Sequence, residues 1–386
     1  MSVANRTKSR ITQKDIARKL GLSQAAVAMA LNPKTQWQLS AETVALVQET
    51  ARALNYIPQK QASILRSGRS YCIGAVWIGG YYHAPRERVR HLAQAAIEAR
   101  YQLVALDVSW FGDNHKGMQE YLLGLAVEGI VFCNLNVNHA RPWSEFLAQH
   151  PLPAVALSSG FSELEAVHPD LKGIFRTLTE HHLAQGSRHL HLLNPAHHPI
   201  DSIAFPGHYP YERGLAFIEA IRAAGGEVIA DEDTAHYWGL PTSFANRRVG
   251  IKGWIHYPPF TPEHKDAFSS GYLTATRILK KGLKAPTSFI CSNDDLAIGA
   301  MHAAFEQGIA IPGELIVSGA DNTPYGEHAY APLTTVDSLA PEMGRWAIRR
   351  LVELIENPEQ RSHPTQKIFD FELVVRQSTR RIHDNP

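Results

Sequence analysis

Short apolar segments alternate with segments of helical apolar spacing through most of the chain, from Cys72 to about residue 356. The apolar run CIGAVWI (72–78), for example, is followed by a helical pattern over 86–100. Such runs are typical of strands buried on both faces, and parallel strands need crossover connections that are usually helical. The further predicted strands are 101–108, 129–135, 152–157, 188–194, 226–230, 287–292 and 314–318, and the further predicted helices are 117–127, 170–185, 211–224, 265–282, 294–307 and 338–356. We therefore expect an α/β body with parallel sheets and right-handed crossovers.

This body takes up about 300 residues, more than one hydrophobic core usually organises, so two Rossmann-like lobes are expected. In open parallel sheets, ligands bind at the carboxyl ends of the strands. The polar residues at those positions are Asp107, Ser158, Ser159, Asn293, Asp294 and Asp321. They predict a small-molecule site between the lobes.

The first part of the chain has a different pattern, which predicts three short capped helices. They run from about 13 to 20, from 24 to 31 and from 41 to 54. The predicted N-cap residues are Thr12, with Asp15 at capping-box spacing, Ser23 and Ser40, and the helix-ending residues are Gly21 and Asn32-Pro33. The predicted inward residues are Ile16, Ala17, Leu20, Ala26, Val27, Ala30, Leu31, Val44, Val47 and Ala51. Two short helices joined by a turn with glycine form a helix-turn-helix unit.

Charge divides the chain at the same place. Residues 1–70 hold eleven Lys and Arg and three Asp and Glu, a net charge of +8. The rest of the chain therefore carries −7, because the whole chain carries +1. A basic, helical head on an acidic body indicates that the head binds a polyanion such as double-stranded DNA.

The second helix of a helix-turn-helix unit lies in the major groove with its N-terminal residues towards the base edges. A glutamine there can bond adenine, whereas alanine and methionine offer apolar contacts only. Small polar side chains at helix ends suit phosphate contacts, which position the head without reading sequence. The predicted base-facing residues are Gln24, Ala25, Ala28 and Met29, and the predicted phosphate-contacting residues are Thr12, Ser23 and Asn32.

The run ITQKDIARKLGLSQAAVAMALN (11–32), followed by LSAETVALVQETARALNYIPQKQASILRSG (39–68), resembles the head and hinge of the LacI/GalR family of bacterial transcriptional regulators. The resemblance implies a short hinge helix after LNYIPQ (54–59) that folds on DNA. Leu65 matches the family leucine that enters the minor groove at the operator centre, where an apolar wedge kinks the base step. The residues of this segment expected at DNA are Tyr56, Gln59, Ala62 and Leu65.

One departure from the family affects how the head reads DNA. The family usually has Ser-Arg late in the recognition helix, with the arginine on the bases, and this chain has Ala28-Met29. We therefore expect the choice of operator to depend on Gln24, on the hinge leucine and on DNA shape.

The resemblance extends over nearly the whole chain. Its body motifs are YERGLAF (211–217), SNDDLAIGAM (292–301), VSGADN (317–322) and PLTTVD (332–337). It implies lobes of the periplasmic-binding-protein type, in which Arg213, Asn293 and Asp321 bind an effector. Ser158 stands where the family has an acid, so sugars and nucleosides both stay open as effector classes. Trp77 and Tyr82 can form a stacking wall or pack in the core or at the rim.

These observations define the expected organisation. The expected parts are a head at 8–56, a hinge at 57–70, a body at 71–376 and a C-terminal tail at 377–386. Within the body, lobe 1 is expected at about 71–161 and 338–365, and lobe 2 at about 162–337 and 366–376.

Metal, disulfide and cofactor chemistry is not expected. Cys72, Cys133 and Cys291 lie far apart without a CxxC pair, which is typical of a reduced compartment. The histidine-rich segment contains His181, His182, His189, His191, His197 and His198. It lacks a metal-ligand spacing, so we expect surface histidines beside a strand.

The sequence thus predicts a transcriptional regulator, by default a repressor, that is cytoplasmic and associated with the nucleoid. Its expected partners are a pseudo-palindromic operator, a small-molecule effector and a second copy of the chain in a homodimer or higher assembly, with no membrane. A candidate dimer surface is the 338–356 helix, with Met343, Trp346, Ile348 and Leu351. Two alternatives stay open: a solute-binding receptor without a DNA role, which would need export, and an enzyme, for which no catalytic motif is found.

Overall fold

The computed structural model contains two compact units, residues 1–70 and 71–386. The described residues are 11–33, 35–56, 68–79, 83–111, 114–135, 137–159, 161, 163–194, 209–245, 250–258, 266–283, 286–362 and 364–380.

The head contains the three expected helices around a small core. They are α1 (Gln13–Leu20), α2 (Gln24–Leu31) and α3 (Ala41–Ala53), with the 3-10 turn η1 (Gln36–Gln38) before α3. The buried apolar residues of this core are Ile16, Ala17, Val27, Ala30, Val47 and Ala51. Leu20, Ala26, Leu31 and Val44 are half-buried at its edge.

Capping sets the helix ends of the head. Ser23 Oγ accepts a hydrogen bond from Ala26 N at 3.1 Å, and Gly21 ends α1 in the left-handed conformation with φ 67°, as expected. Thr12 is the N-cap of α1 and forms a capping box with Asp15, as expected. Asp15 Oδ2 accepts from Thr12 N at 2.9 Å and also from the Thr12 hydroxyl at 2.7 Å.

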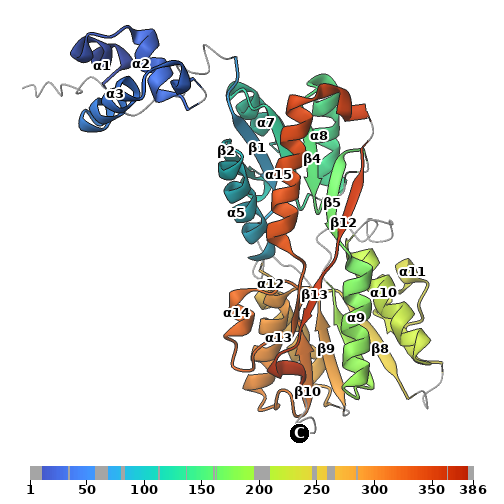
Figure 1. Ribbon diagram of the computed structural model, residues 1–386. Helices are drawn as coiled ribbons and strands as arrows, with labels where there is room; N and C mark the ends of the chain where they lie inside the picture. Colours follow the sequence, from blue (N-terminus) through green and yellow to red (C-terminus); the bar gives the residue numbers. More distant parts are fainter. Residues whose placement is uncertain are drawn as a thin grey trace, which may run out of the picture. The chain divides into compact units, whose positions relative to one another are not determined.

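In the body, lobe 1 is built on a six-stranded parallel sheet, sheet A, in the order β12-β5-β4-β3-β1-β2. Its strands are β1 (Cys72–Trp77), β2 (Gln102–Asp107), β3 (Gly129–Cys133), β4 (Ala154–Leu157), β5 (Glu165–Pro169) and β12 (Gln366–Phe369). Helices α5 (His83–Glu98) and α15 (Ala340–Glu356) pack together on one face (Figure 1). The short helix α6 (Val108–Phe111) follows β2, and α7 (His115–Gly124) and α8 (Val137–Gln149) cover the other face.

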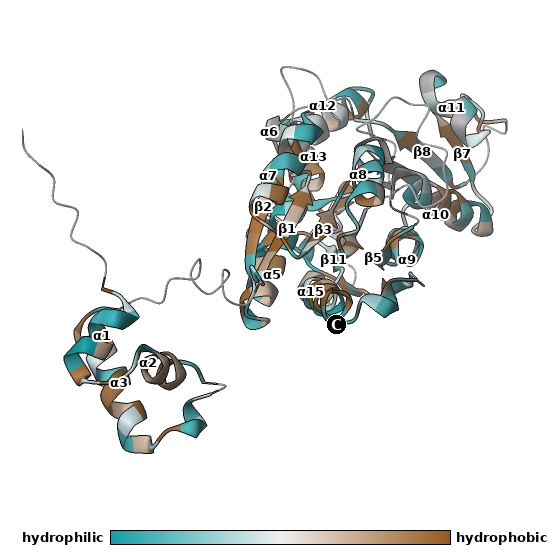
Figure 2. Ribbon diagram, turned by 90° about the horizontal axis from the view of Figure 1, so that it is seen from above, coloured by the Kyte–Doolittle hydropathy of each residue, from teal (hydrophilic) through white to brown (hydrophobic). Residues whose placement is uncertain are grey.

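Alternation along the strands explains both layers. Ile73, Val131 and Val155 belong to the cluster with α5 and α15, whereas Ile130 and Phe132 belong to the cluster with α7 and α8. Side chains on a strand point alternately to the two faces, so a sheet covered on both faces needs continuous apolar strands. In Figure 2, strands such as β2 and β7 carry mainly hydrophobic colour, whereas the helices carry both colours.

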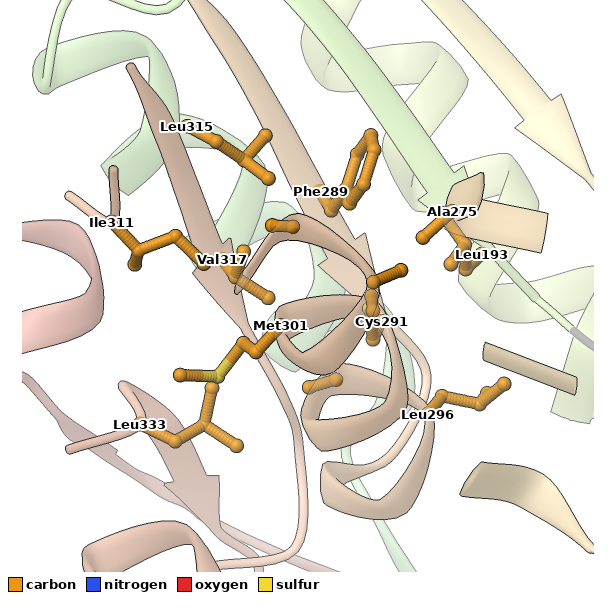
Figure 3. Close-up of a cluster of buried hydrophobic side chains, with 14 of the residues drawn as sticks. Leu193, Ala275, Phe289, Cys291, Leu296, Met301, Ile311, Leu315, Val317 and Leu333 are labelled. Carbon is orange, nitrogen blue, oxygen red and sulfur yellow. The ribbon is translucent and has the colours of Figure 1, made fainter. Parts of the chain in front are cut away.

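Lobe 2 is built on a five-stranded parallel sheet, sheet B, in the order β10-β9-β6-β8-β7. Its strands are β6 (His189–Leu193), β7 (Glu227–Ala230), β8 (Lys252–His256), β9 (Thr287–Cys291) and β10 (Leu315–Ser318). Its helices are α9 (Leu171–Ala184), α10 (Tyr209–Ala223), α11 (Glu232–Trp238), α12 (Ala267–Leu279), α13 (Asp294–Glu306) and α14 (Pro324–Glu327). Figure 3 shows part of the core of lobe 2, in which Met301 lies beside Leu333 and near Val317.

The chain passes between the lobes three times: after β5, after β11 (Thr335–Asp337) and after β12. Strand β11 pairs in an antiparallel ladder with β13 (Glu372–Val374), which follows β12. The boundaries therefore differ from the expected positions, because β5 and β12 were expected in lobe 2 and both extend sheet A. Ser378 and Thr379 were expected in the C-terminal tail, but they are buried against lobe 2 in η4 (Gln377–Thr379).

Several elements were not predicted from the pattern. Strand β5 (EAVHP) lacks a continuous apolar run because it contains Glu165 and His168, and its Glu165 is buried in an ion pair with Arg350 at 2.7 Å. Helix α8 contains Pro142 within its length, which hides the helical pattern. Within the described segments, every helix is too short or too polar to cross a lipid bilayer.

Candidate functional site

The first turn of α2 presents its side chains to solvent. Ser23, Gln24 and Ala25 are exposed, whereas Ala28 and Met29 are half-buried one turn further on. The carbonyl of Met29 accepts a hydrogen bond from Thr35 Oγ1 at 3.2 Å, which ties the end of α2 to the turn that follows. The side chains most available to a partner on this helix are therefore those of its N-terminal turn.

The remaining predicted DNA contacts fall into two groups. Thr12 and Asn32 are exposed at helix ends, and Tyr56 is half-buried against the head core. Gln59, Ala62 and Leu65 lie outside the described residues. All of these DNA contacts stay predictions.

In the body, the carboxyl edges of sheets A and B approach each other where β1 leads into α5 and β9 leads into α13. His83, the first residue of α5, donates from its backbone N to Asp295 Oδ2 at 2.9 Å. Its ring also meets the Tyr325 ring of α14 edge-on, with centroids 4.7 Å apart. These contacts join the two lobes beside the positions predicted to bind an effector.

Asp321 lies at this junction, just after β10. Its backbone N donates to Thr335 Oγ1 at 3.0 Å, and its side chain is half-buried. Burial raises the pKa of Asp321 well above its ordinary value, and Asp294 and Asp295 raise the same pKa further. The guanidinium groups of Arg88 and Arg213 partly offset these effects. The carboxylate is thus poorly solvated, and a ligand with hydrogen-bond donors would satisfy it.

The structure brings two other predicted effector residues to the same junction. Arg213, on α10, influences the ionisation of Asp321, and its guanidinium lies 5.6 Å from the centre of the Phe175 ring. Asn293 is buried, and its Oδ1 caps α13 by accepting from Leu296 N at 2.9 Å. Arg213 thus acts on Asp321 electrostatically, and Asn293 stands at the start of α13 directly before Asp294 and Asp295, which also act on Asp321.

Two neighbouring acids, Asp294 and Asp107, already have hydrogen-bond partners within the protein. Asp294 is fully buried, and its two oxygens accept from Thr323 N, Thr323 Oγ1 and Thr335 Oγ1 at 2.6 to 2.9 Å. It therefore fixes the loop of Asp321 and is not available to a ligand. Asp107 is likewise occupied, because its Oδ1 accepts from Ser109 N at 3.0 Å.

Ser158 and Ser159 end β4 with different roles. Ser159 Oγ donates to Phe132 O and accepts from Leu135 N, both at 3.0 Å, and so braces the loop after β3. Ser158 is completely buried with φ 51°, and its Oγ has no hydrogen-bond partner among the described residues. An unpaired buried hydroxyl is costly, which makes Ser158 a candidate ligand contact.

The predicted aromatic wall remains untested. Trp77 is half-buried and packs with the α5 side of lobe 1. Its ring covers the backbone of Gly79 so closely that a Cβ added there would lie 1.7 Å from the ring. Tyr82 lies outside the described residues.

Sequence reasoning missed Arg88, the buried cation of lobe 1. It lies in the second turn of α5, and its Nη1 donates to Asn134 Oδ1 just beyond β3, at 2.9 Å. The helical pattern of 86–100 did not separate it from the other arginines of that helix. The available signal was its position one turn inside a helix that follows the first strand.

The expectation of surface histidines is wrong for two of them. His182 is fully buried and its Nε2 lies 2.8 Å from Ser318 Oγ, and His191 is buried with its Nδ1 2.9 Å from His256 Nε2. Both residues sit on elements that pack in the lobe 2 core, where each ring needs a polar partner. Within the ranges that the structure describes, no group of three or more His, Cys, Asp or Glu could hold a metal ion. His197 and His198 lie outside those ranges.

Comparison with known proteins places this architecture. The family model for the periplasmic binding protein-like domain matches residues 179–379. The chain is 26% identical over 379 residues to the HTH-type transcriptional repressor PurR of Glaesserella parasuis serovar 5 (strain SH0165), covering 96% of this chain and 99% of that protein. It is 27% identical over 380 residues to the HTH-type transcriptional regulator AglR of Rhizobium meliloti (strain 1021), covering 96% of this chain and 94% of that protein.

A solved structure has the same fold. The lac repressor dimer bound to operator and the anti-inducer ONPF matches with a TM-score of 0.70 at 22% identity, covering 96% of this chain and 99% of that chain. Fold and site thus define a two-lobed, periplasmic-binding-protein-like body that follows a helix-turn-helix head. The chain belongs to the LacI/GalR family of transcriptional regulators.

Proposed function

We propose that this protein is a sequence-specific, DNA-binding transcriptional repressor whose operator affinity is controlled by a small molecule bound between the two lobes. The observation that carries the proposal is the pairing of two sites in one chain. One is the exposed N-terminal turn of α2 in a basic head, and the other is the junction of Asp321, Arg213 and Asn293 in the body.

Several features of the relatives support this function. PurR is named as a transcriptional repressor and AglR as a transcriptional regulator, and both match almost end to end. The lac repressor neighbour is described as a dimer on its operator with a bound anti-inducer. By analogy, this chain acts as a homodimer on a pseudo-palindromic operator, in the cytoplasm and associated with the nucleoid, and its effector is a sugar or a nucleoside.

The alternatives account for less of the molecule. A solute receptor or an enzyme would use the body alone and would leave the helix-turn-helix head and its charge of +8 without a role. Repressors of this family are not enzymes, and the residues at the lobe junction are suited to binding.

Binding-site selection on random duplex DNA with the full chain tests the proposal. We expect a pseudo-palindromic consensus. Gln24→Ala should then weaken binding to the selected site by roughly 5- to 150-fold and leave non-specific binding unchanged, because a bidentate base contact contributes about 1–3 kcal/mol of discrimination. Recovery of unenriched sequences would refute operator recognition.

A further inference from the structure

The carboxyl edge of sheet A carries a buried cation with an unused donor. Arg88 is only 9% exposed, although it lies near the start of α5. Its Nη1 donates to Asn134 Oδ1 at 2.9 Å, while its Nε is buried without a hydrogen-bond partner among the described residues. A buried guanidinium in this state is costly unless an acceptor or an opposite charge reaches it.

The same edge holds a second unsatisfied polar atom. Asn134 follows β3, and its backbone N donates to Leu157 O at 3.1 Å, which brings it beside Ser158 at the end of β4. Ser158 Oγ is also buried without a partner among the described residues. Arg88 is thus bonded to Asn134, and Asn134 is bonded to the residue before Ser158, so the two unsatisfied atoms are linked to neighbouring strand ends of sheet A.

The acids near the junction do not supply the missing partner within lobe 1. Asp294 is occupied by Thr323 and Thr335, and Asp295 accepts from the backbone of His83. Asp321 belongs to lobe 2, across the junction from Arg88, and the two side chains interact electrostatically. The site is thus polarised, with a cation and a hydroxyl on the lobe 1 side and a carboxylate on the lobe 2 side.

We propose that the effector is a hydroxylated small molecule with an acidic group, either a carboxylate or a phosphate ester, and that Arg88 binds this acidic group. Hydroxyl groups at the other end of the molecule would donate to Asp321. A guanidinium suits this role, because its fork of N–H donors matches the oxygens of a carboxylate or phosphate. The inference rests on the proposed function, since it assigns a chemical class to the effector of that function.

Calorimetric titration of the full chain with matched ligands tests the inference. The panel consists of glucose, glucuronate and glucose 6-phosphate; galactose and galacturonate; ribose and ribose 5-phosphate; and adenosine and adenosine 5′-monophosphate. We expect one acidic compound to bind at least about tenfold more tightly than its neutral counterpart, the scale of a charged hydrogen bond. Carboxylate and phosphate members tell the two sources of the anion apart. Tighter binding of a neutral member, or no binding by any acidic one, overturns the inference.

Variants separate ligand recognition from a structural role. Arg88→Met should lower the affinity for the acidic compound about tenfold or more and change that for its neutral counterpart less than about threefold. Arg90→Met is the matched control, because Arg90 lies on the same helix in an exposed pair with Glu87 at 2.7 Å. It should leave both affinities unchanged. Equal losses for acidic and neutral compounds in Arg88→Met would mean that Arg88 only supports the fold, and would overturn the inference.

Operator binding keeps the two proposals distinguishable. If a neutral sugar binds more tightly than its acidic counterparts and changes operator affinity, the regulatory function stands and the acidic effector is excluded. If the full chain selects no operator, the regulatory function fails, whereas calorimetry still decides what Arg88 binds.

Discussion

Asp321 and Asp294 are acids of the same lobe, the first half-buried and the second fully buried, and they have different tasks. Asp294 receives three hydrogen bonds from Thr323 and Thr335, which offset part of the rise in its pKa that burial causes. Asp321 instead stands at the lobe junction among like charges, with its pKa raised by burial, Asp294 and Asp295. The sequence placed both residues at strand ends, but only the structure shows which one is engaged.

The raised pKa of Asp321 has a consequence for stability. A carboxyl group whose pKa is higher in the folded than in the unfolded state binds more protons when folded, so stability falls as pH rises from about 4 through the folded-state pKa. Asp321→Asn should therefore stabilise the ligand-free protein at pH 7.5 by about 1 kcal/mol and abolish its stabilisation by effector. Thermal unfolding with and without ligand measures both.

Asp294→Ala provides the contrast. It should destabilise the protein by about 2 kcal/mol or more, because it leaves the buried Thr323 N without an acceptor. A loss of stability in Asp321→Asn comparable to that of Asp294→Ala would contradict the division of roles.

At the scale of elements, the packing of α12 on α13 depends on two glycines. A Cβ added to Gly299 would lie 2.1 Å from Phe268 O, and one added to Gly271 would lie 2.2 Å from Leu296 O. Gly299→Ala should therefore destabilise the protein by about 1–3 kcal/mol through overpacking. Chemical denaturation measures the change.

Gly124→Ala is the control for this substitution. Gly124 ends α7, and nothing lies within 4 Å of the Cβ that alanine would add. Alanine there should be neutral or stabilising by up to about 1 kcal/mol. Equal effects at both positions would mean that the α12–α13 packing tolerates more separation than the structure indicates.

The paired histidines of β6 and β8 give lobe 2 a pH-dependent stability. Burial, followed by His256, His189 and Lys281, lowers the pKa of His191 well below 6.5. Folded protein then binds fewer protons than unfolded protein, so this contribution is present above about pH 6.5 and is lost as the pH falls below it. Thermal unfolding at pH 7.5, 6.0 and 5.0 should show the decline.

His191→Phe should reduce that decline, since a phenylalanine can keep the stack on Trp254, where the ring centres lie 4.5 Å apart. His302→Gln, which changes an exposed residue of α13, should leave the pH profile as in the original protein. If both variants follow the original profile, the acid sensitivity has another source.

Helices and strands were predicted correctly where the local sequence, through a capping residue or an apolar run, determines the structure. The caps Ser23 and Ser40 and the apolar strands of both sheets are read directly from local sequence. Strands β5 and β12 were assigned to the wrong lobe, because their pairing depends on tertiary contacts such as Glu165 with Arg350 and Thr365. Arg88 was missed for the same reason, since its hydrogen-bond partner Asn134 lies on a distant segment of the chain.

At the scale of the whole molecule, a basic helix-turn-helix head precedes a two-lobed body in one chain. We expect a ligand at the lobe junction to change the operator affinity of the head by changing the contacts between the two lobes. Examples of such contacts are those of His83 with Asp295 and Tyr325. Such coupling is reciprocal, because the free energy that links two binding sites is the same from either side.

The most direct test measures this reciprocity in the full chain. Operator affinity is measured with and without a saturating amount of the tightest-binding compound of the sugar and nucleotide panel, and the affinity for that compound with and without operator. We predict that both affinities change by the same factor, roughly 5- to 150-fold, and that Asp321→Ala removes both changes. A compound that binds equally well with and without operator, or the lack of any binder in the panel, would contradict the account.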